Sequence, residues 1–186
     1  MIVIKTPVGH PGSENDIMTE FRVVSVAELK PVLDVLNGLS WPVAFEEFPA
    51  IFERLGWEVQ RKSGGSTSLA VSKRQVSVGK LGDELSEFWF RVSDTVAEVG
   101  AASKASLEEA FTRASQVVSE CMGFAPTGIP WAVPGAVWDL PDGRQVRVLI
   151  GERSIDLMYW SKDLADNDRY ARRRGIDPAD DYTDRD

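Results

Sequence analysis

The chain has 186 residues, 43% of them hydrophobic and 27% charged, which is ordinary for a globular protein and sufficient for one domain with a substantial core. Its formal charge of −8 argues against nucleic-acid binding, which needs a basic surface, and its single cysteine excludes an internal disulfide. Because no apolar run approaches the roughly 20 residues that cross a bilayer, and the start has no secretory-signal pattern, we expect a cytoplasmic protein with no membrane contact.

The two ends of the sequence differ in composition from its middle. Residues 1–24 contain the single histidine, His10, in a leader with prolines and glycines that precedes the first helical pattern. At the other end, residues 175–186 include "DPADDYTDRD", which has five aspartates and one arginine. Exposed termini of this kind are typically mobile. We therefore expect one domain over 25–174, flanked by a flexible leader and an acidic, disordered tail.

Two amphipathic segments are expected to form helices before the first strand. In "SVAELKPVLDVLNG" the apolar residues recur with helical spacing, Ser25 and Glu28 predict a capping box, and Gly38 predicts the end. In "WPVAFEEFPAIFERLGW" we expect Pro49 to divide a short turn from a second helix, which Gly56 then ends. Helices at this point give the domain an apolar surface that a sheet can cover.

Alternation of polar and apolar residues predicts strands in the next part of the chain. The pattern begins after Trp57 and continues in "TSLAVS" (67–72), "QVSVGKL" (75–81) and "SEFWFRVSD" (86–94). We expect "SGGS" (63–66) to be a turn, because glycine and serine favour turns. This part of the sequence predicts three or four consecutive antiparallel strands.

The second half of the domain repeats the order of a helix followed by strands. Residues 104–122 give the clearest helical pattern, with a capping box expected from Ser106 and Glu109 and with Cys121 on the apolar stripe. Strands are predicted at "AVWDL", "RQVRVLI" and "SIDLMYW", and a last helix at 161–174. Strands that follow one another through tight turns pair antiparallel. The order helix–helix–strands–helix–strands–helix therefore predicts an α+β fold, a single antiparallel sheet with helices packed on one face.

No residue pattern specifies a catalytic site. His10 lies in a leader that offers no rigid support, and Cys121 on an apolar stripe is expected to pack as a small hydrophobic residue. Carboxylate pairs such as Glu46/Glu47 and Glu108/Glu109 fall on polar helix faces. The glycine run "SGGSTS" lacks the spacing of nucleotide-binding loops. We therefore expect no enzyme activity, catalytic residues, cofactor or metal.

The run "YWSKDLADNDRYARRRG" places aspartates before arginines. Its aspartates, Asp163, Asp166 and Asp168, lack the alternate spacing and the glycine of a calcium loop. Acidic residues in the early turns and basic residues in the last turn of a helix complement the helix dipole. The run therefore predicts a helix between Ser161 and Gly175, whose acidic end is also a candidate surface for a basic partner.

Tryptophans on the strands suggest a second surface. Trp89 and Arg91 alternate with Phe88 and Phe90, and must face the opposite side of their strand. Trp138 alternates in the same way with its neighbours, and we expect some of these rings on the sheet face without helices. Exposed aromatic residues mark interaction surfaces. The candidate partner contacts are Trp89, Arg91, Asp163, Asp166 and Asp168.

The run "LGWEV" after an amphipathic helix, then "SLEEAFTRASQVV", "WDLPDGRQVRVLI" and "SIDLMYW", resembles a family of small actinobacterial proteins over roughly residues 25–162. That family is associated with immunity proteins of polymorphic-toxin and type VII secretion neighbourhoods. The resemblance implies a binding protein that neutralises a cognate toxin by occluding it, and it implies no catalytic residues.

Two other functions stay open from the sequence. The order of elements is similar to that of secretion chaperones, which implies a chaperone or adaptor for an exported protein. A small enzyme that uses carboxylates, or a ligand-binding domain, is the third alternative. The acidic charge favours a basic protein partner, such as a basic toxin domain, for the first of these functions.

Overall fold

The computed structural model describes residues 21–131 and 133–176 of the chain. Its elements follow in the order α1 (Val26–Asn37), a 3-10 helix (Phe45–Glu47), α2 (Phe48–Leu55), β1 (Glu58–Arg61), β2 (Gly64–Ser66), β3 (Gln75–Leu81), β4 (Glu84–Arg91), α3 (Ala101–Met122), β5 (Gly135–Asp139), β6 (Gln145–Ile150), β7 (Ile155–Trp160) and α4 (Lys162–Arg174). The predicted order of helices and strands is confirmed.

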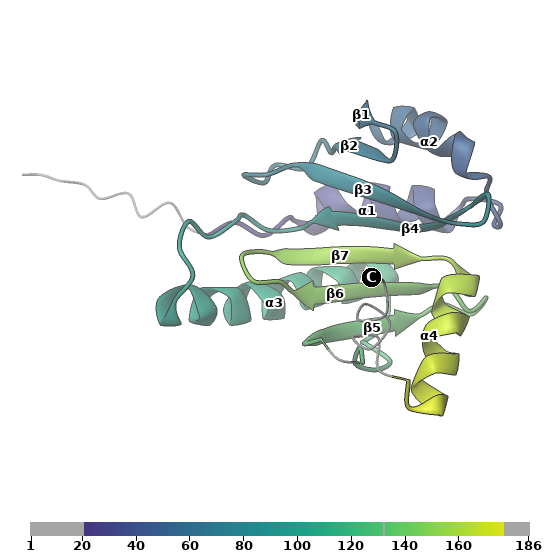
Figure 1. Cartoon of the computed structure of the whole chain (residues 1–186). Coiled ribbons are helices and arrows are strands. Elements are labelled where there is room, and N and C mark those ends of the chain that lie inside the picture. The colour runs from purple at the N-terminus through teal and green to yellow at the C-terminus, as the bar shows by residue number, and fades with distance from the viewer. Residues whose placement is uncertain (1–20, 132, 177–186) are drawn as a thin grey trace, which may run out of the picture.

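The seven strands form one antiparallel sheet with the order β1-β2-β3-β4-β7-β6-β5. Each run of consecutive strands forms a meander, and the two meanders meet where β4 pairs with β7, with Phe90 opposite Leu157. Figure 1 shows α1 and α3 behind the sheet and α4 across its lower right end. The prediction of an α+β fold with a single antiparallel sheet is confirmed.

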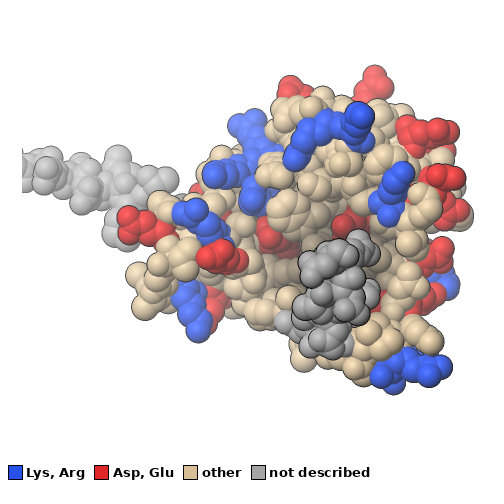
Figure 2. All heavy atoms as spheres, viewed as in Figure 1, with Lys and Arg blue, Asp and Glu red and all other residues tan. Residues whose placement is uncertain are grey.

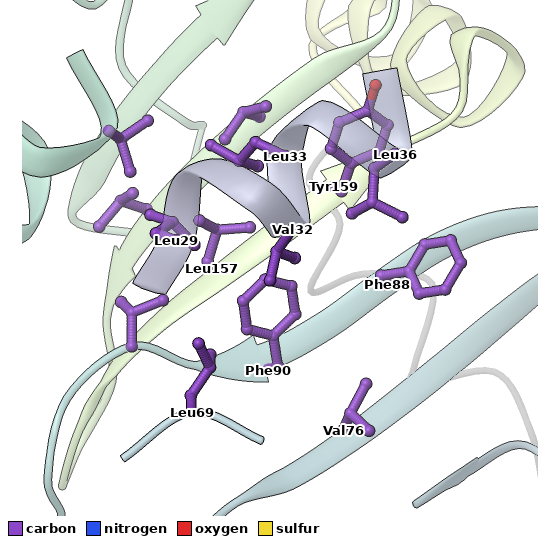
Figure 3. Close-up of a cluster of buried hydrophobic side chains, with 14 of the residues drawn as sticks. Leu29, Val32, Leu33, Leu36, Leu69, Val76, Phe88, Phe90, Leu157 and Tyr159 are labelled. Carbon is purple, nitrogen blue, oxygen red and sulfur yellow. The ribbon is translucent and has the colours of Figure 1, made fainter. Parts of the chain in front are cut away.

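The hydrophobic core lies between the sheet and the helices behind it. Residues of α1 point onto alternate residues of β4 and β7 (Figure 3), and the members of this cluster are Leu29, Val32, Leu33, Leu36, Phe88, Phe90, Leu157 and Tyr159. All of them are buried. Burying a side chain of this size stabilises a fold by about 1.5–3 kcal/mol before entropy costs. Cys121 packs against the same core, as its place on the apolar stripe predicts.

Several helix ends form as the sequence predicts. Ser25 and Glu28 form the expected capping box of α1, and Pro31 lies inside that helix without ending it. Pro49 lies in the first turn of α2, directly after the 3-10 helix. Gly56 caps α2 with φ of 67°, a left-handed conformation that favours glycine. Such caps depend on residues a few positions apart, which is why the sequence reveals them.

The start of α3 differs from the prediction. The helix begins at Ala101, and the Ser106 hydroxyl donates to the carbonyl of Ala102 inside the helix. The expected capping box of Ser106 and Glu109 is therefore wrong. Instead, the Ser103 hydroxyl accepts a hydrogen bond from the Gly100 N–H. Two alanines at the start extend the helix by a turn, because alanine has the highest helix propensity.

Two local predictions between residues 63 and 72 are also wrong. The "SGGS" segment is mostly strand β2, and "TSLAVS" forms no strand. A Cβ atom on Gly65 would lie 1.8 Å from the Glu58 carbonyl oxygen, so glycine allows β1 and β2 to approach. Leu69 and Val71 are buried in the core, and this packing accounts for the alternating pattern of a segment that pairs with no strand.

Some predictions concern residues beyond those described. His10 and the "DPADDYTDRD" segment lie outside the described residues, so the limits of the leader, domain and tail stay predictions. None of the helices within 21–131 and 133–176 combines the length and the apolar composition that spanning a membrane requires.

Candidate functional site: the open face of the sheet

The side of the sheet opposite α1 and α3 carries a mixed aromatic and charged surface. On β4 and β7, residues that alternate with the buried core residues are half-buried. We call six of them the open face: Glu87, Trp89, Arg91, Asp156, Met158 and Trp160. The prediction that Trp89 and Arg91 face away from Phe88 and Phe90 is confirmed. Trp138, by contrast, is fully buried and faces the helices.

The pairing register of β4 with β7 arranges the open face in three rows. Glu87 lies opposite Trp160, Trp89 opposite Met158, and Arg91 opposite Asp156. A carboxylate therefore stands at each end, with two large apolar side chains between them. Glu87 and Asp156 are separated by four residue positions along the strands, which corresponds to roughly 13 Å.

Trp89 and Arg91 form one contact pair. The Arg91 guanidinium lies 5.4 Å from the centroid of the Trp89 ring. Its Nε donates to the Ser154 hydroxyl at 3.3 Å, whereas its Nη1 is buried and has no acceptor among the described residues. A buried donor without an acceptor is costly. This guanidinium therefore retains capacity for an anionic acceptor.

Burial raises the pKa of both carboxyl groups of the open face. The pKa of Glu87 is raised by desolvation, which the Trp160 indole and the charge of Arg147 only partly offset. Desolvation likewise raises the pKa of Asp156, although the Ser154 hydroxyl, the charge of Arg91 and the Trp89 indole each act to lower it. Both carboxylates have lost hydrating water, and the hydrogen bonds and charges around them do not fully replace it. A hydrogen-bond donor from a bound molecule would therefore stabilise their charged forms.

Arg147 on β6 is a central residue of this side that the sequence did not single out. Its side chain is buried, and it donates to Gln145 Oε1 and to Asp168 Oδ2, the latter at 2.7 Å. Its guanidinium lies 3.5 Å from the centroid of the Trp160 ring. The signal was present in "RQVRVLI", where Gln145 and Arg147 alternate with buried valines, but the sequence does not reveal what covers them.

The three predicted aspartates of α4 have different surroundings. Asp168 is an internal partner of Arg147, and its side chain is only 14% exposed. Asp166 pairs with Lys162 and Arg169. Asp163 is exposed in the first turn, beside a small cavity at the end of the sheet. The predicted helix is confirmed, because α4 runs from the Ser161 cap to Gly175.

α4 closes the β5–β6 end of the open side. Arg169 bridges the elements, since it contacts Asp139 of β5 at 2.7 Å and the Gly143 carbonyl at 3.0 Å. Burial acts to raise the pKa of Asp139, but hydrogen bonds from Gln145, Arg169 and Thr127 outweigh it and lower that pKa. Together with the Arg147–Asp168 pair, these contacts hold α4 over β5 and β6, so the face of β3, β4 and β7 is left without a helix (Figure 1).

The cavity at the end of the sheet is small, and the hydrogen-bond donors of its arginine, Arg144, are already occupied. It has a volume of about 220 Å³ and is lined by residues that include Trp41, Leu85 and Arg144. Arg144 donates to the carbonyls of Leu36 and Asn37, and to the Tyr159 hydroxyl at 2.6 Å. Its role is therefore to join α1 to the sheet, and no free donor is left for a ligand.

Within residues 21–131 and 133–176, no group of three or more His, Cys, Asp and Glu side chains could hold a metal ion. The open face is a strand-supported surface with apolar residues in the centre and charges at the rim, an arrangement that is typical of protein interfaces.

The fold and this surface define a class of α+β protein with one antiparallel sheet. Helices α1 and α3 lie on one side of the sheet, and on the other side α4 covers only the β5–β6 end and leaves a mixed aromatic and charged surface on β4 and β7. The chain belongs to a family of unknown function, DUF6301, whose model matches residues 27–161. The match contains Trp89 and Arg91 and ends before α4. No curated protein and no solved structure matches the chain.

Proposed function

We propose that this protein is a non-catalytic binding protein that contacts a protein partner through the open face, and that it serves as an immunity protein which occludes a cognate toxin. The binding role is carried by one observation: Trp89 and Met158 lie side by side on β4 and β7, in a part of the sheet face that no helix of the described part covers. Aromatic residues at the centre of a charged rim are typical of the anchors of protein interfaces.

The spacing of the carboxylates favours binding over hydrolysis. Pairs that cleave glycosidic bonds stand about 5–9.5 Å apart, whereas Glu87 and Asp156 are separated by roughly 13 Å along the strands. The alternative of a carboxylate-using enzyme or ligand-binding domain would need both groups at one substrate, and this register disfavours it.

The immunity role rests on the sequence resemblance, and the geometry is compatible with it. Occlusion needs no catalytic group in the inhibitor, only a surface that is already shaped for its target. Residues held on paired strands lose little conformational freedom on binding, which favours affinity. We place this action in the cytoplasm, where a protein with a single free cysteine meets no oxidising pressure.

One feature supports the chaperone or adaptor alternative. Strand β1 (Glu58–Arg61) is the outermost strand at its edge of the sheet, and all four of its residues are exposed. An exposed edge can accept an extended segment of another protein as an additional strand. A partner that binds as an unfolded segment, and that is exported rather than toxic, would favour this alternative.

The proposed function is tested with Trp89→Ala and a matched aromatic control, Tyr170→Ala. Tyr170 is an exposed residue of α4 whose ring contacts Arg174. The full chain is immobilised and exposed to extracts of its native host, and captured proteins are then expressed alone and with the wild type. We expect a captured protein that inhibits growth alone, that the wild type and Tyr170→Ala neutralise, and that Trp89→Ala binds about 30-fold more weakly.

Equal capture by all three proteins would contradict a role for the open face. A partner that depends on Trp89 but has no toxicity would contradict the immunity role and leave the binding role in place. Circular dichroism of both variants checks that the fold is retained.

A further inference from the structure

We propose that a basic groove beside the open face binds a carboxylate-rich segment of the protein partner. We define the basic groove by Arg61, Lys73, Arg74 and Arg91. This inference rests on the proposed binding role and specifies the chemistry of the partner at one place.

The groove lies where β1, β2, β3 and β4 meet the loop before β3. It has a volume of about 540 Å³, and Ser66 and Gln75 line it together with its four cationic residues. No carboxylate lines it. Figure 2 shows Lys and Arg side chains gathered at the upper left, over this part of the sheet. In a chain with a net charge of −8, this concentration of positive charge is a local exception.

The cations of the groove have few close partners within the described part of the chain, although the charge of Arg91 acts on Asp156 without a close contact. None of the four forms an ion pair there, whereas Arg144, Arg147 and Arg169 each contact a carboxylate at 2.7 or 2.8 Å. Arg61 makes only a long contact, 3.5 Å from its Nη2 to the Val76 carbonyl. The arginines that build the fold are therefore paired, and those of the groove are left for another partner.

Arg91 gives the strongest indication of an anionic acceptor. Its buried Nη1 has no hydrogen-bond acceptor among the described residues. Asp156, opposite Arg91 on β7, accepts from the Ser154 hydroxyl at 2.9 Å and makes no hydrogen bond with the guanidinium. Because Arg91 lines the groove, a carboxylate that enters it would meet a guanidinium with unused donor capacity, and charged hydrogen bonds of this kind are among the stronger ones in proteins.

The groove and the open face form one continuous surface. Ser66 pairs in register with Gln75, which precedes Val76, and Val76 pairs with Phe90 next to Arg91. A segment that crosses the strands here meets Arg91 and then the Trp89 ring on which Arg91 lies. An acidic segment with an apolar residue beside it fits this order.

Carboxylates of a protein fit this groove better than a nucleic acid. A phosphate backbone needs cations along its length, but here they are confined to one groove on an acidic molecule that repels a long polyanion. The net charge of the protein governs the long-range approach of a partner, so we still expect a partner whose overall charge is basic. The residues in contact decide the binding, and in the groove these are cations.

The experiment measures binding of a labelled peptide of alternating glutamate and glycine, with its glutamine counterpart as the neutral reference. The groove variant is Lys73→Gln/Arg74→Gln, in which both positions are exposed. The matched control is Lys104→Gln/Arg173→Gln, which removes the same charge from exposed positions on α3 and α4. We expect about tenfold weaker binding for the groove variant, wild-type affinity for the control, and weakening by salt.

Equal losses in the two variants would overturn the inference, because binding would then follow net charge alone. The groove would be assigned to nucleic acid if a single-stranded oligonucleotide bound more tightly than the peptide and if the groove variant lost this oligonucleotide binding. A chain ended at Ile176 that binds the peptide more than tenfold tighter through an intact groove would assign it to this chain's own acidic end. If the native partner depends on Trp89 while the peptide does not bind, the proposed function stands and this inference fails.

Discussion

At the scale of single residues, Arg147 shows how a charged side chain is accommodated in the sheet. Its guanidinium has Gln145, Asp168 and the Trp160 ring around it, so the charge is paired although it is buried. Removing one member of such a pair leaves the other uncompensated, which costs more than the pair contributes. Arg147 therefore acts on stability and on the position of α4, because Asp168 belongs to that helix.

We expect Arg147→Met to lower the free energy of unfolding by about 3 kcal/mol, because the Asp168 carboxylate, whose side chain is only 14% exposed, would lose its positively charged partner. Arg147→Met/Asp168→Leu should recover part of this loss. The comparison is Lys162→Met, which breaks an exposed pair with Asp166 and should change the stability far less than Arg147→Met does. Urea denaturation measures all three, and equal losses for Arg147→Met and Lys162→Met would contradict the burial argument.

Glu28 predicts a pH-dependent contribution to stability. Burial acts to raise its pKa, but hydrogen bonds from the Ser25 backbone and hydroxyl, Arg22 and the Ala70 backbone lower it from 4.5 to about 2. A lowered pKa means that the carboxylate stabilises the fold above pH 4.5 and that this contribution is lost as the pH falls toward 2.

Glu28→Gln should therefore be less stable than the wild type at neutral pH by about 1–2 kcal/mol, which is less than the full pKa shift implies because solvent screens this partly exposed carboxylate. The difference should shrink between pH 4.5 and about 2, as the wild-type carboxylate is protonated. Denaturation across this pH range measures it, with Glu46→Gln, an exposed glutamate of the 3-10 helix, as the control. A difference that is constant with pH would contradict the role of the charge.

At the scale of elements, the β1–β2 hairpin depends on the absence of side chains. Cβ atoms at Gly64 and Gly65 would lie 2.4 Å from the Val76 carbonyl oxygen and 1.8 Å from that of Glu58. Both glycines therefore allow neighbouring strands to lie at pairing distance. The hairpin forms one wall of the basic groove, so its pairing also positions Arg61.

Gly65→Ala is expected to separate β1 from β2 and to destabilise the protein by about 1–3 kcal/mol through overpacking. Hydrogen exchange should show faster exchange of the β1 and β2 amides. Gly100→Ala is the matched control, since a Cβ there meets nothing within 4 Å and φ is −177°, and its stability should change by less than about 1 kcal/mol. Unchanged exchange in Gly65→Ala would show that the hairpin tolerates a side chain.

At the scale of the whole molecule, one strand pair joins two meanders that are far apart in the sequence. Phe90 on β4 and Leu157 on β7 are paired neighbours, and both are fully buried against the helices. Because the core is continuous across this pair, we expect the described domain to unfold in a single transition.

Leu157→Ala should lower the free energy of unfolding by about 2–5 kcal/mol, because it leaves a cavity in the shared core. Amide protection should fall in β3 as well as in β6, although these strands lie in different meanders. Val99→Ala, at an exposed position, is the control and should change little. Loss of protection confined to β5, β6 and β7 would show that the two meanders unfold separately.

The sequence by itself determined the features that depend on neighbours a few positions apart. Capping of α1 by Ser25, the ends of α4 at Ser161 and Gly175, and the side of β4 on which Trp89 lies are all local, and they form as predicted. Order of elements and antiparallel pairing followed from the same local signals, because strands joined by tight turns have little choice of direction.

Only the tertiary structure decided which distant residues meet. The pairing of β4 with β7 places Trp89 beside Met158, and the packing of α4 makes Asp168 an internal partner of Arg147 while Asp163 stays exposed. The basic groove likewise brings together cations from β1, β4 and a loop. Local periodicity depends only on residues that are close in the sequence, so it cannot predict contacts between segments so far apart in the chain. For this reason the acidic sequence did not reveal the cationic groove.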